Sequence, residues 1–299
     1  NELQQLTNTS LDGGGNTQQL QYYAQFNFRP SARLQFNAGL HLLYFNLNRS
    51  FSPEPRLSMR YDFSERSRFS LAYGLHGQVL PMATYFYQER DTINGQVQFS
   101  RPNFDLPIIN SHHLVASYNY VTRGNLKMTA ELYLQSLFNV PVEPDNASLY
   151  WMLNNRGEFP EFRATSDGTG LNYGVDLAVE KFFANKFYLL LTASFFDSSF
   201  RPFNGVRYNS RFNTRFASTY TIGREFNFRK GGVLQVGTRI MYNGGFRYSP
   251  FDPTLSGQLG RFIALEGAQW SEQVGPYFRV DGRISFRANK PKYASIISL

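Results

Sequence analysis

The sequence of 299 residues contains no cysteine, which excludes disulfides, zinc sites built from thiolates and cysteine nucleophiles. It also lacks an unbroken apolar run of about twenty residues, the length that a transmembrane helix needs. The longest apolar stretch, residues 182–196, is interrupted by Asn185, Lys186 and Thr192. A membrane-spanning helix is therefore excluded, in agreement with the mean hydropathy of −0.39.

Signatures of catalysis are equally scarce. The sequence has no Gly-x-Ser-x-Gly segment, and Asp-Gly-Thr-Gly at 167–170 lacks the lysine of a phosphate-binding loop. The adjacent His112 and His113 would point to opposite faces of a strand, so they are a poor pair of metal ligands. We expect no enzymatic activity, no catalytic residue, no cofactor and no metal site.

The net charge is +8, which can indicate nucleic-acid binding. However, the Lys and Arg residues are spread along the chain and form no block, so we expect no nucleic-acid partner. Aromatic residues are abundant, with 29 Phe and 19 Tyr. Both features suit a membrane β-barrel, which keeps charge in a polar interior and aromatic girdles at the membrane interfaces.

One stretch, residues 33–79, shows the organising pattern of the chain. Apolar residues occupy every second position from Leu34 to Tyr44, and the positions between them are polar or small. After an expected proline-containing loop at 48–55, the alternation returns at 57–63 and 69–79. This alternation predicts strands with one apolar and one polar face. Runs of about nine to eleven residues match the length with which a tilted strand crosses a bilayer.

The same unit recurs to the end of the chain and predicts twelve strands. They begin near residues 18, 33, 56, 69, 112, 126, 171, 187, 212, 234, 278 and 293. The connections alternate in length, with short ones near 30, 65, 124, 185, 228 and 290 and longer ones near 50, 95, 155, 204 and 260. Outer-membrane barrels have short periplasmic turns and longer extracellular loops. We therefore predict an all-β fold, an antiparallel transmembrane β-barrel in the cell outer membrane.

The direction of the strands bears on domain organisation. The first strand enters a short turn and so descends toward the periplasm, and the twelfth strand then rises toward the outside. An open sheet edge leaves unpaired backbone groups in hydrocarbon, which is costly. We expect residues 1–299 to be a partial barrel domain, with a plug, the N-terminal strands and the last strand absent.

A family resemblance rests on four segments near the start of the chain. They are Glu54-Pro55-Arg56 with the strand 57–61, the segment 73–78 (Tyr-Gly-Leu-His-Gly-Gln), Pro81, and Tyr85-Phe86. Here the sequence resembles TonB-dependent outer-membrane receptors of the Bacteroidetes type, which carry a carboxypeptidase-regulatory-like domain. The resemblance implies a barrel of about 22 strands with a plugged lumen. The twelve strands would then be the tenth to the twenty-first.

The function that this resemblance implies is TonB-powered uptake of a bulky nutrient through a plugged barrel. Implied partners are outer-membrane lipid, TonB through a part outside this chain, and a surface lipoprotein. Two alternatives stay open from the residues alone: a passive, porin-like channel, and a barrel that serves as the scaffold of a surface or secretion complex.

Two sets of residues are candidates for function. Loop residues that would contact a ligand are Tyr85, Tyr87, Arg90, Trp151, Phe162, Arg163, Tyr248 and Trp270. For any single aromatic residue of this set, packing in a loop or girdle is the commoner reason. Residues expected to line the lumen are Arg33, His41, Arg60, His76, Lys127, Arg215, Arg239, Arg279 and Arg283. These lumen cations would favour anionic solutes or seat acidic plug residues, or they would balance Glu131, Asp176, Glu180 and Asp281.

Overall fold

The computed structural model describes residues 14–93, 96–154, 159–184, 186–228, 231–260, 263, 265, 267–290 and 292–299. In this part of the chain, twelve antiparallel strands follow one another across one sheet, and the short β11 pairs with β10 beside them. The twelve strands, in sheet order, are β1 (Gln19–Ser31), β2 (Leu34–Phe45), β3 (Ser50–Asp62), β4 (Ser67–Gln78), β7 (Ile109–Val121), β8 (Leu126–Val142), β9 (Thr165–Ala184), β10 (Phe187–Arg201), β12 (Phe216–Asn227), β13 (Gly232–Asn243), β16 (Tyr277–Asn289) and β17 (Ala294–Ser298). The predicted fold class is confirmed: the sheet is a portion of an antiparallel barrel.

The strand register brings the apolar positions of neighbouring strands onto one face of the sheet. Phe36 of β2 lies opposite Phe28 of β1 on one side and Met59 of β3 on the other. Further along the sheet, Ile240 of β13 lies between Tyr220 of β12 and Val280 of β16. A shift of one residue in any pairing would turn that strand's apolar side to the other face, so the hydrophobic pattern fixes the register.

No second layer covers this apolar face within the described residues. Large side chains in the middle of the strands are exposed, for example Leu132 at 57%, Phe195 at 55% and Val280 at 54%. A monomeric soluble protein rarely exposes so wide an apolar surface. Among the described residues, no helix has the length and apolar character to cross a membrane.

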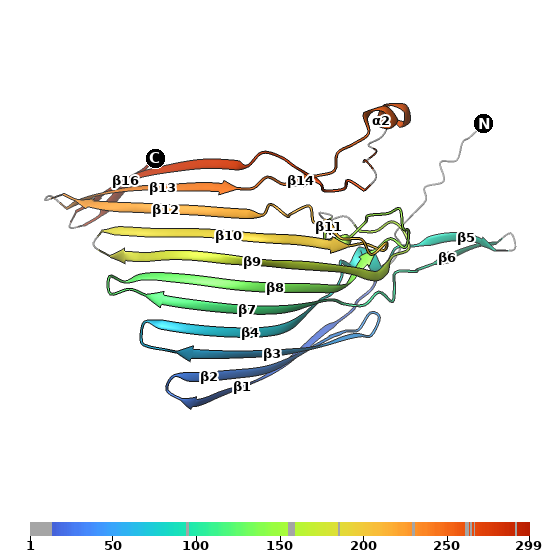
Figure 1. Cartoon of the computed structure of the whole chain (residues 1–299), viewed down its shortest axis with the longest axis horizontal. Helices are drawn as coiled ribbons and strands as arrows, with labels where there is room; N and C mark the ends of the chain where they lie inside the picture. Colours follow the sequence, from blue (N-terminus) through green and yellow to red (C-terminus); the bar gives the residue numbers. More distant parts are fainter. Residues whose placement is uncertain are drawn as a thin grey trace.

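The connections segregate to the two ends of the sheet (Figure 1). Short turns lie at one end, among them 32–33, 63–66 and 122–125. The long connections lie together at the other end, which is on the right of the view. These connections carry the minor elements α1 (Met82–Tyr85), β5 (Glu89–Ile93), β6 (Gln96–Ser100), η1 (Met152–Asn154), β11 (Tyr208–Asn209), β14 (Arg247–Tyr248), α2 (Pro253–Leu259) and β15 (Glu272–Gln273). The predicted segregation of turns and loops is therefore present.

A compact hydrophobic cluster lies at the loop end. It joins the ends of several strands to the connections between them, and its buried members are Phe45, Leu80, Tyr85, Leu106, Ile109, Leu137, Val140, Val142, Trp151, Met152, Ala164 and Phe200. Buried asparagines link the connections by hydrogen bonds: Asn103 Nδ2 donates to the Phe162 carbonyl at 2.9 Å, and its Oδ1 accepts from the Ala164 amide at 2.8 Å. The loops thus form a packed core of their own.

Three strand boundaries differ from the prediction. Strand β3 begins at Ser50, so the connection after β2 is only 46–49 and both prolines lie inside a strand. Pro53 and Pro55 pair with β2, while the ladder between β3 and β4 stops at Arg56 and Gly74. A proline is tolerated where one side of the strand is unpaired. Strand β9 starts earlier than expected, at Thr165, and β12 starts later, at Phe216.

Candidate functional site

Most residues that were predicted to line the lumen lie on the polar face of the sheet. By register and alternation this group comprises His41, Arg60, His76, Lys127, Arg239, Arg279 and Arg283. Two members of the predicted set lie elsewhere. Arg33 is in the turn between β1 and β2, and Arg215 is in the connection just before β12, with a backbone φ of 66°. The prediction had extended both strands by a few residues too many.

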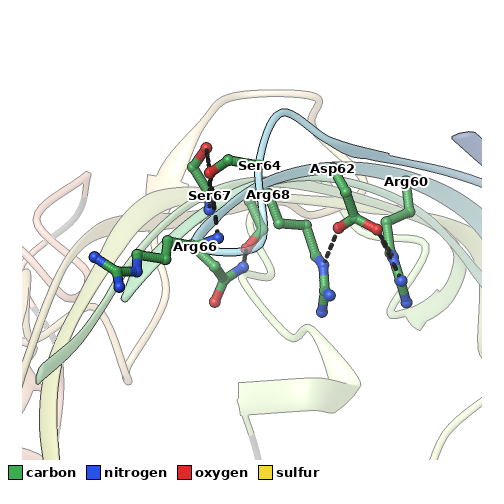
Figure 2. A network of polar contacts seen from close by, with 8 residues as sticks. Arg60, Asp62, Ser64, Arg66, Ser67 and Arg68 are labelled. Atoms are coloured by element: carbon green, nitrogen blue, oxygen red, sulfur yellow. Dashed lines mark hydrogen bonds and ion pairs between the residues drawn. The ribbon is translucent and has the colours of Figure 1, made fainter. Parts of the chain in front are cut away.

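Charges on the polar face are largely paired with each other near the turn end. Near the turn end, Lys127 Nζ lies 3.7 Å from Glu180 Oε2, and a further pair nearer the loop end joins Arg279 Nε to Asp281 Oδ1 at 2.8 Å. Figure 2 shows Asp62 between two arginines: its Oδ1 lies 2.6 Å from Arg68 Nε and its Oδ2 lies 2.9 Å from Arg60 Nη2. These contacts favour the charge-balance interpretation for this end of the face.

A cavity of about 530 Å³ lies around Arg56 of β3. Arg56 is opposite Gly39 of β2 on one side and Gly74 of β4 on the other. Because neither glycine has a side chain, the sheet surface is open over Gly39, and the His76 ring can lie over Gly74, where a Cβ would be 2.7 Å from its Nε2. His41, His76, His113, Asn37 and Ser58 also line the hollow.

A buried carboxylate holds the arginine and one histidine of this cavity. Glu54, only 2% exposed, accepts from Arg56 Nη2 at 3.2 Å and contacts His41 Nδ1 at 2.9 Å, both through Oε2. A Cβ at Gly77 would lie 2.7 Å from Glu54 Oε1, so the segment 73–78 can approach the carboxylate only with glycine at this position. The residues that carried the family resemblance therefore meet in space and support the cavity.

The cavity combines one guanidinium with three imidazoles. The rings of His76 and His113 meet edge to face with centroids 4.7 Å apart, and His113 Nε2 lies 3.0 Å from Gln135 Nε2. His112, one residue along, stacks on Tyr73 and Phe138, in keeping with the predicted opposite directions of the two rings. The described residues contain no group of three or more His, Asp or Glu side chains arranged to hold a metal ion. The arrangement offers hydrogen-bond donors to a polar group, from the imidazoles and from a guanidinium whose charge Glu54 balances.

A second hollow, of about 360 Å³, lies on the polar face over β8, β9, β10 and β12. Glu131 and Asp176 are directly opposite each other in the register, and both line this hollow. The Ser194 hydroxyl donates to the Asp176 carboxylate. Like charges placed opposite each other repel, so this part of the face has an acidic character that the balance with lysine and arginine does not remove.

Four of the predicted ligand-contacting aromatic residues are part of the loop core. Tyr85 is fully buried and Trp151 is 6% exposed, while Phe162 and Trp270 pack against the cluster. Burial raises the pKa of the Tyr85 hydroxyl to about 12, although the Leu80 amide donates to it at 3.3 Å. The expectation that Tyr85 and Trp151 present stacking surfaces is therefore corrected, because neither ring has much surface to offer.

The remaining predicted loop residues are accessible. Tyr248 is 45% exposed, and Arg90 is exposed at the start of the β5–β6 hairpin. Arg163 Nη2 lies 2.9 Å from Glu89 Oε2, which ties the connection before β9 to this hairpin. Burial raises the pKa of Tyr87, and the nearby Glu89 raises it further.

The sequence analysis missed one arginine that organises the loop end. Arg247 is 6% exposed, and its guanidinium donates to the carbonyls of Asn213, Trp270 and Ser271 at 3.1, 3.3 and 3.1 Å. Burial lowers its pKa below the usual value, and the neighbouring Arg215 acts in the same direction. Arg247 did not stand out by charge or spacing. Of the cavity residues, the Glu-Pro-Arg motif pointed to Glu54 and Arg56, and His113 was considered only with His112 as a pair of metal ligands.

Comparison with known proteins places the fold in a class. The sheet matches a portion of the 22-strand barrels of TonB-dependent receptors. It resembles the ferric-catecholate import receptor Fiu from E. coli, with a TM-score of 0.63 at 10% identity over 92% of this chain and 39% of that one. It likewise resembles the ferripyoverdine receptor of the outer membrane of Pseudomonas aeruginosa, with a TM-score of 0.63 at 13% identity over 94% of this chain and 34% of that one.

A third similar structure is the siderophore receptor PiuA from Acinetobacter baumannii, with a TM-score of 0.61 at 14% identity. That match covers 92% of this chain and 37% of the receptor. The chain therefore spans well under half the length of the proteins that it resembles. No protein-family model matches the sequence, and neither does any curated protein. At such low identity the likeness describes the fold alone.

Proposed function

We propose that this chain forms part of the barrel of an outer-membrane transporter, which takes up a bulky nutrient with energy delivered through TonB. The observation that carries the proposal is the pair of opposite faces: an apolar face that no second layer of the described residues covers, and a polar face that carries the charged side chains, several of them in ion pairs. A barrel wall in lipid needs this distribution, because lipid-facing and lumen-facing residues alternate along each strand. The likeness to import receptors supports the same function.

The finer parts of the proposal rest on the motif segments and on the accessible loop residues. The motif residues from Glu54 to Phe86 favour a receptor of the Bacteroidetes type, and such a receptor would work with TonB and with a surface lipoprotein at the loops. The accessible residues Tyr87, Arg90, Arg163 and Tyr248 are the proposed first contacts for the nutrient, since they lie at the loop end. Arg56 and the histidines around it would meet the solute, or a plug residue, inside the barrel. We propose no covalent chemistry for this protein.

The test is uptake by cells. A strain that lacks the gene should grow poorly on one member of a panel of bulky nutrients, which includes ferric siderophores and oligosaccharides. Uptake should stop when the proton gradient is collapsed with an uncoupler. Uptake that survives the uncoupler would instead favour a passive channel. A deletion strain with normal uptake, together with stoichiometric partners on purification, would favour the scaffold role and reject transport.

A further inference from the structure

Two cations lie on the apolar face of the sheet, close to the turn end. Lys181 of β9 is opposite Leu189 of β10, and Arg224 of β12 is opposite Phe187 of the same strand. Lys181 Nζ is 5.9 Å from the centroid of the Phe187 ring, and Arg224 Cζ is 5.3 Å from that of Phe226. The two cations therefore flank one strand, with aromatic rings beneath their side chains.

Their surroundings differ from those of Lys127 on the polar face. Lys127 is opposite Glu180, next to Lys181 in the ladder, and its amine is paired with that carboxylate. Across the described residues, by contrast, neither Lys181 nor Arg224 has an ion pair with an acidic side chain. Two positive charges thus lie on the apolar face without an acidic side chain to neutralise them among the described residues.

The depth of these residues limits what can neutralise them. Lys181 is three residues from the end of β9 and Arg224 is three residues from the end of β12. At about 3.3 Å per residue, each is roughly 10 Å from its strand end. Cations near the end of a spanning strand can extend their heads to the headgroup layer while their stems stay on apolar surface. The negative group available at that level is a lipid phosphate.

We propose that Lys181 and Arg224 together bind the phosphate of an anionic phospholipid, in the leaflet next to the short turns. The acyl chains would lie on Leu189 and Ile222, which are opposite each other; Leu189 is beside Lys181, and Ile222 is two residues from Arg224 along β12. A free phosphate ion is the less suitable occupant, because the neighbouring residues are apolar rings and aliphatic chains that suit a lipid. This inference rests on the proposed membrane location.

The experiment measures lipid preference around the intact protein. The protein is placed in nanodiscs that contain zwitterionic phosphatidylethanolamine and a minor share of phosphatidylglycerol, and the lipids that remain bound are counted by native mass spectrometry. We expect phosphatidylglycerol to be enriched. The enrichment should fall in Lys181→Gln/Arg224→Gln, by about fivefold per cation or about 25-fold for the pair. The single variants should lie between the two.

Lys127→Gln/Arg287→Gln is the matched control, since it removes the same charge near the turn end from the polar face. It should keep the wild-type enrichment. Three outcomes would overturn the proposal. They are phosphatidylglycerol enrichment in the Lys181/Arg224 double variant equal to that of the wild type, a loss in the control equal to that of the double variant, and displacement of the lipid by millimolar inorganic phosphate. If the double variant does not assemble, the two single variants decide in the same way. Protein that enters nanodiscs without enrichment refutes the lipid site alone, whereas protein that cannot enter bilayers refutes the proposed function as well.

Discussion

The side chain of Asn103 joins two of the long connections, and its removal should loosen the loop core without unfolding the sheet. Asn103 has no exposed surface, and both ends of its amide are used. In Asn103→Ala the Phe162 carbonyl and the buried Ala164 amide lose their partners. Leaving a buried group unsatisfied costs about 1–3 kcal/mol, so we expect a local loss of about 2–4 kcal/mol.

Hydrogen exchange gives a direct measurement, because the Ala164 amide is itself the donor. If exchange proceeds by local opening, this loss should speed exchange at Ala164 by about 30- to 1,000-fold. Amides in the middle of β8 and β9 should keep their protection. Asn204→Ala is the control, since Asn204 is a half-buried loop asparagine that bonds to Asn146, Val206 and Tyr208 and not to Phe162 or Ala164. Exchange at Ala164 within threefold of wild type would refute the reasoning.

Three further predictions concern the sheet and the loop core. Gly77→Ala should lower the free energy of unfolding, measured by urea titration, by about 1–3 kcal/mol, because the new Cβ would lie 2.7 Å from a buried carboxylate oxygen. Gly282→Ala is the control and should be nearly neutral, because a Cβ there would have no atom within 4 Å. Leu177→Arg should cost about 2–4 kcal/mol of folding stability in liposomes, and Ala178→Arg on the polar face much less; equal costs would contradict the assignment of the faces. The pKa of Tyr85 is about 12 in the folded protein and about 10 in the unfolded chain. Its neutral hydroxyl therefore stabilises the fold fully below pH 10, and this contribution to the free energy of unfolding is lost as the pH rises from 10 to 12. Tyr85→Phe should reduce this alkaline loss by up to about 2–3 kcal/mol, and an unchanged pH profile of urea unfolding would reject it.

The sheet could be predicted because period-two alternation is a local signal. Residues such as Leu34–Tyr44 alternate so regularly that the strand, its faces and its approximate length follow from the sequence. The ends of the strands were harder to predict. Pro53 and Pro55 suggested a loop, but the missing amide hydrogens fall where β3 has no partner on its β4 side, and this depends on the pairing of other strands.

The candidate site was less predictable, because it depends on which residues of different strands meet. The two glycines beside Arg56 are 35 positions apart in the sequence, and only the register brings them to either side of one arginine. The burial of Tyr85 and Trp151 could not be predicted for the same reason. A tryptophan such as Trp151 is equally suited to a ligand or to a core, and the choice is made by Phe200, which stacks on it at 5.2 Å from a distant strand.

Strands β8 and β9 have 17 and 20 residues, more than the nine to eleven or so that a bilayer requires. Their surplus lies at the loop end, where Val140 and Val142 belong to the buried cluster. At the loop end, β8 and β9 have apolar protein neighbours and backbone pairing that do not depend on lipid. If the proposed membrane location holds, this part of β8 and β9 can pair in water, and the part of each strand that enters the bilayer extends a pairing that already exists.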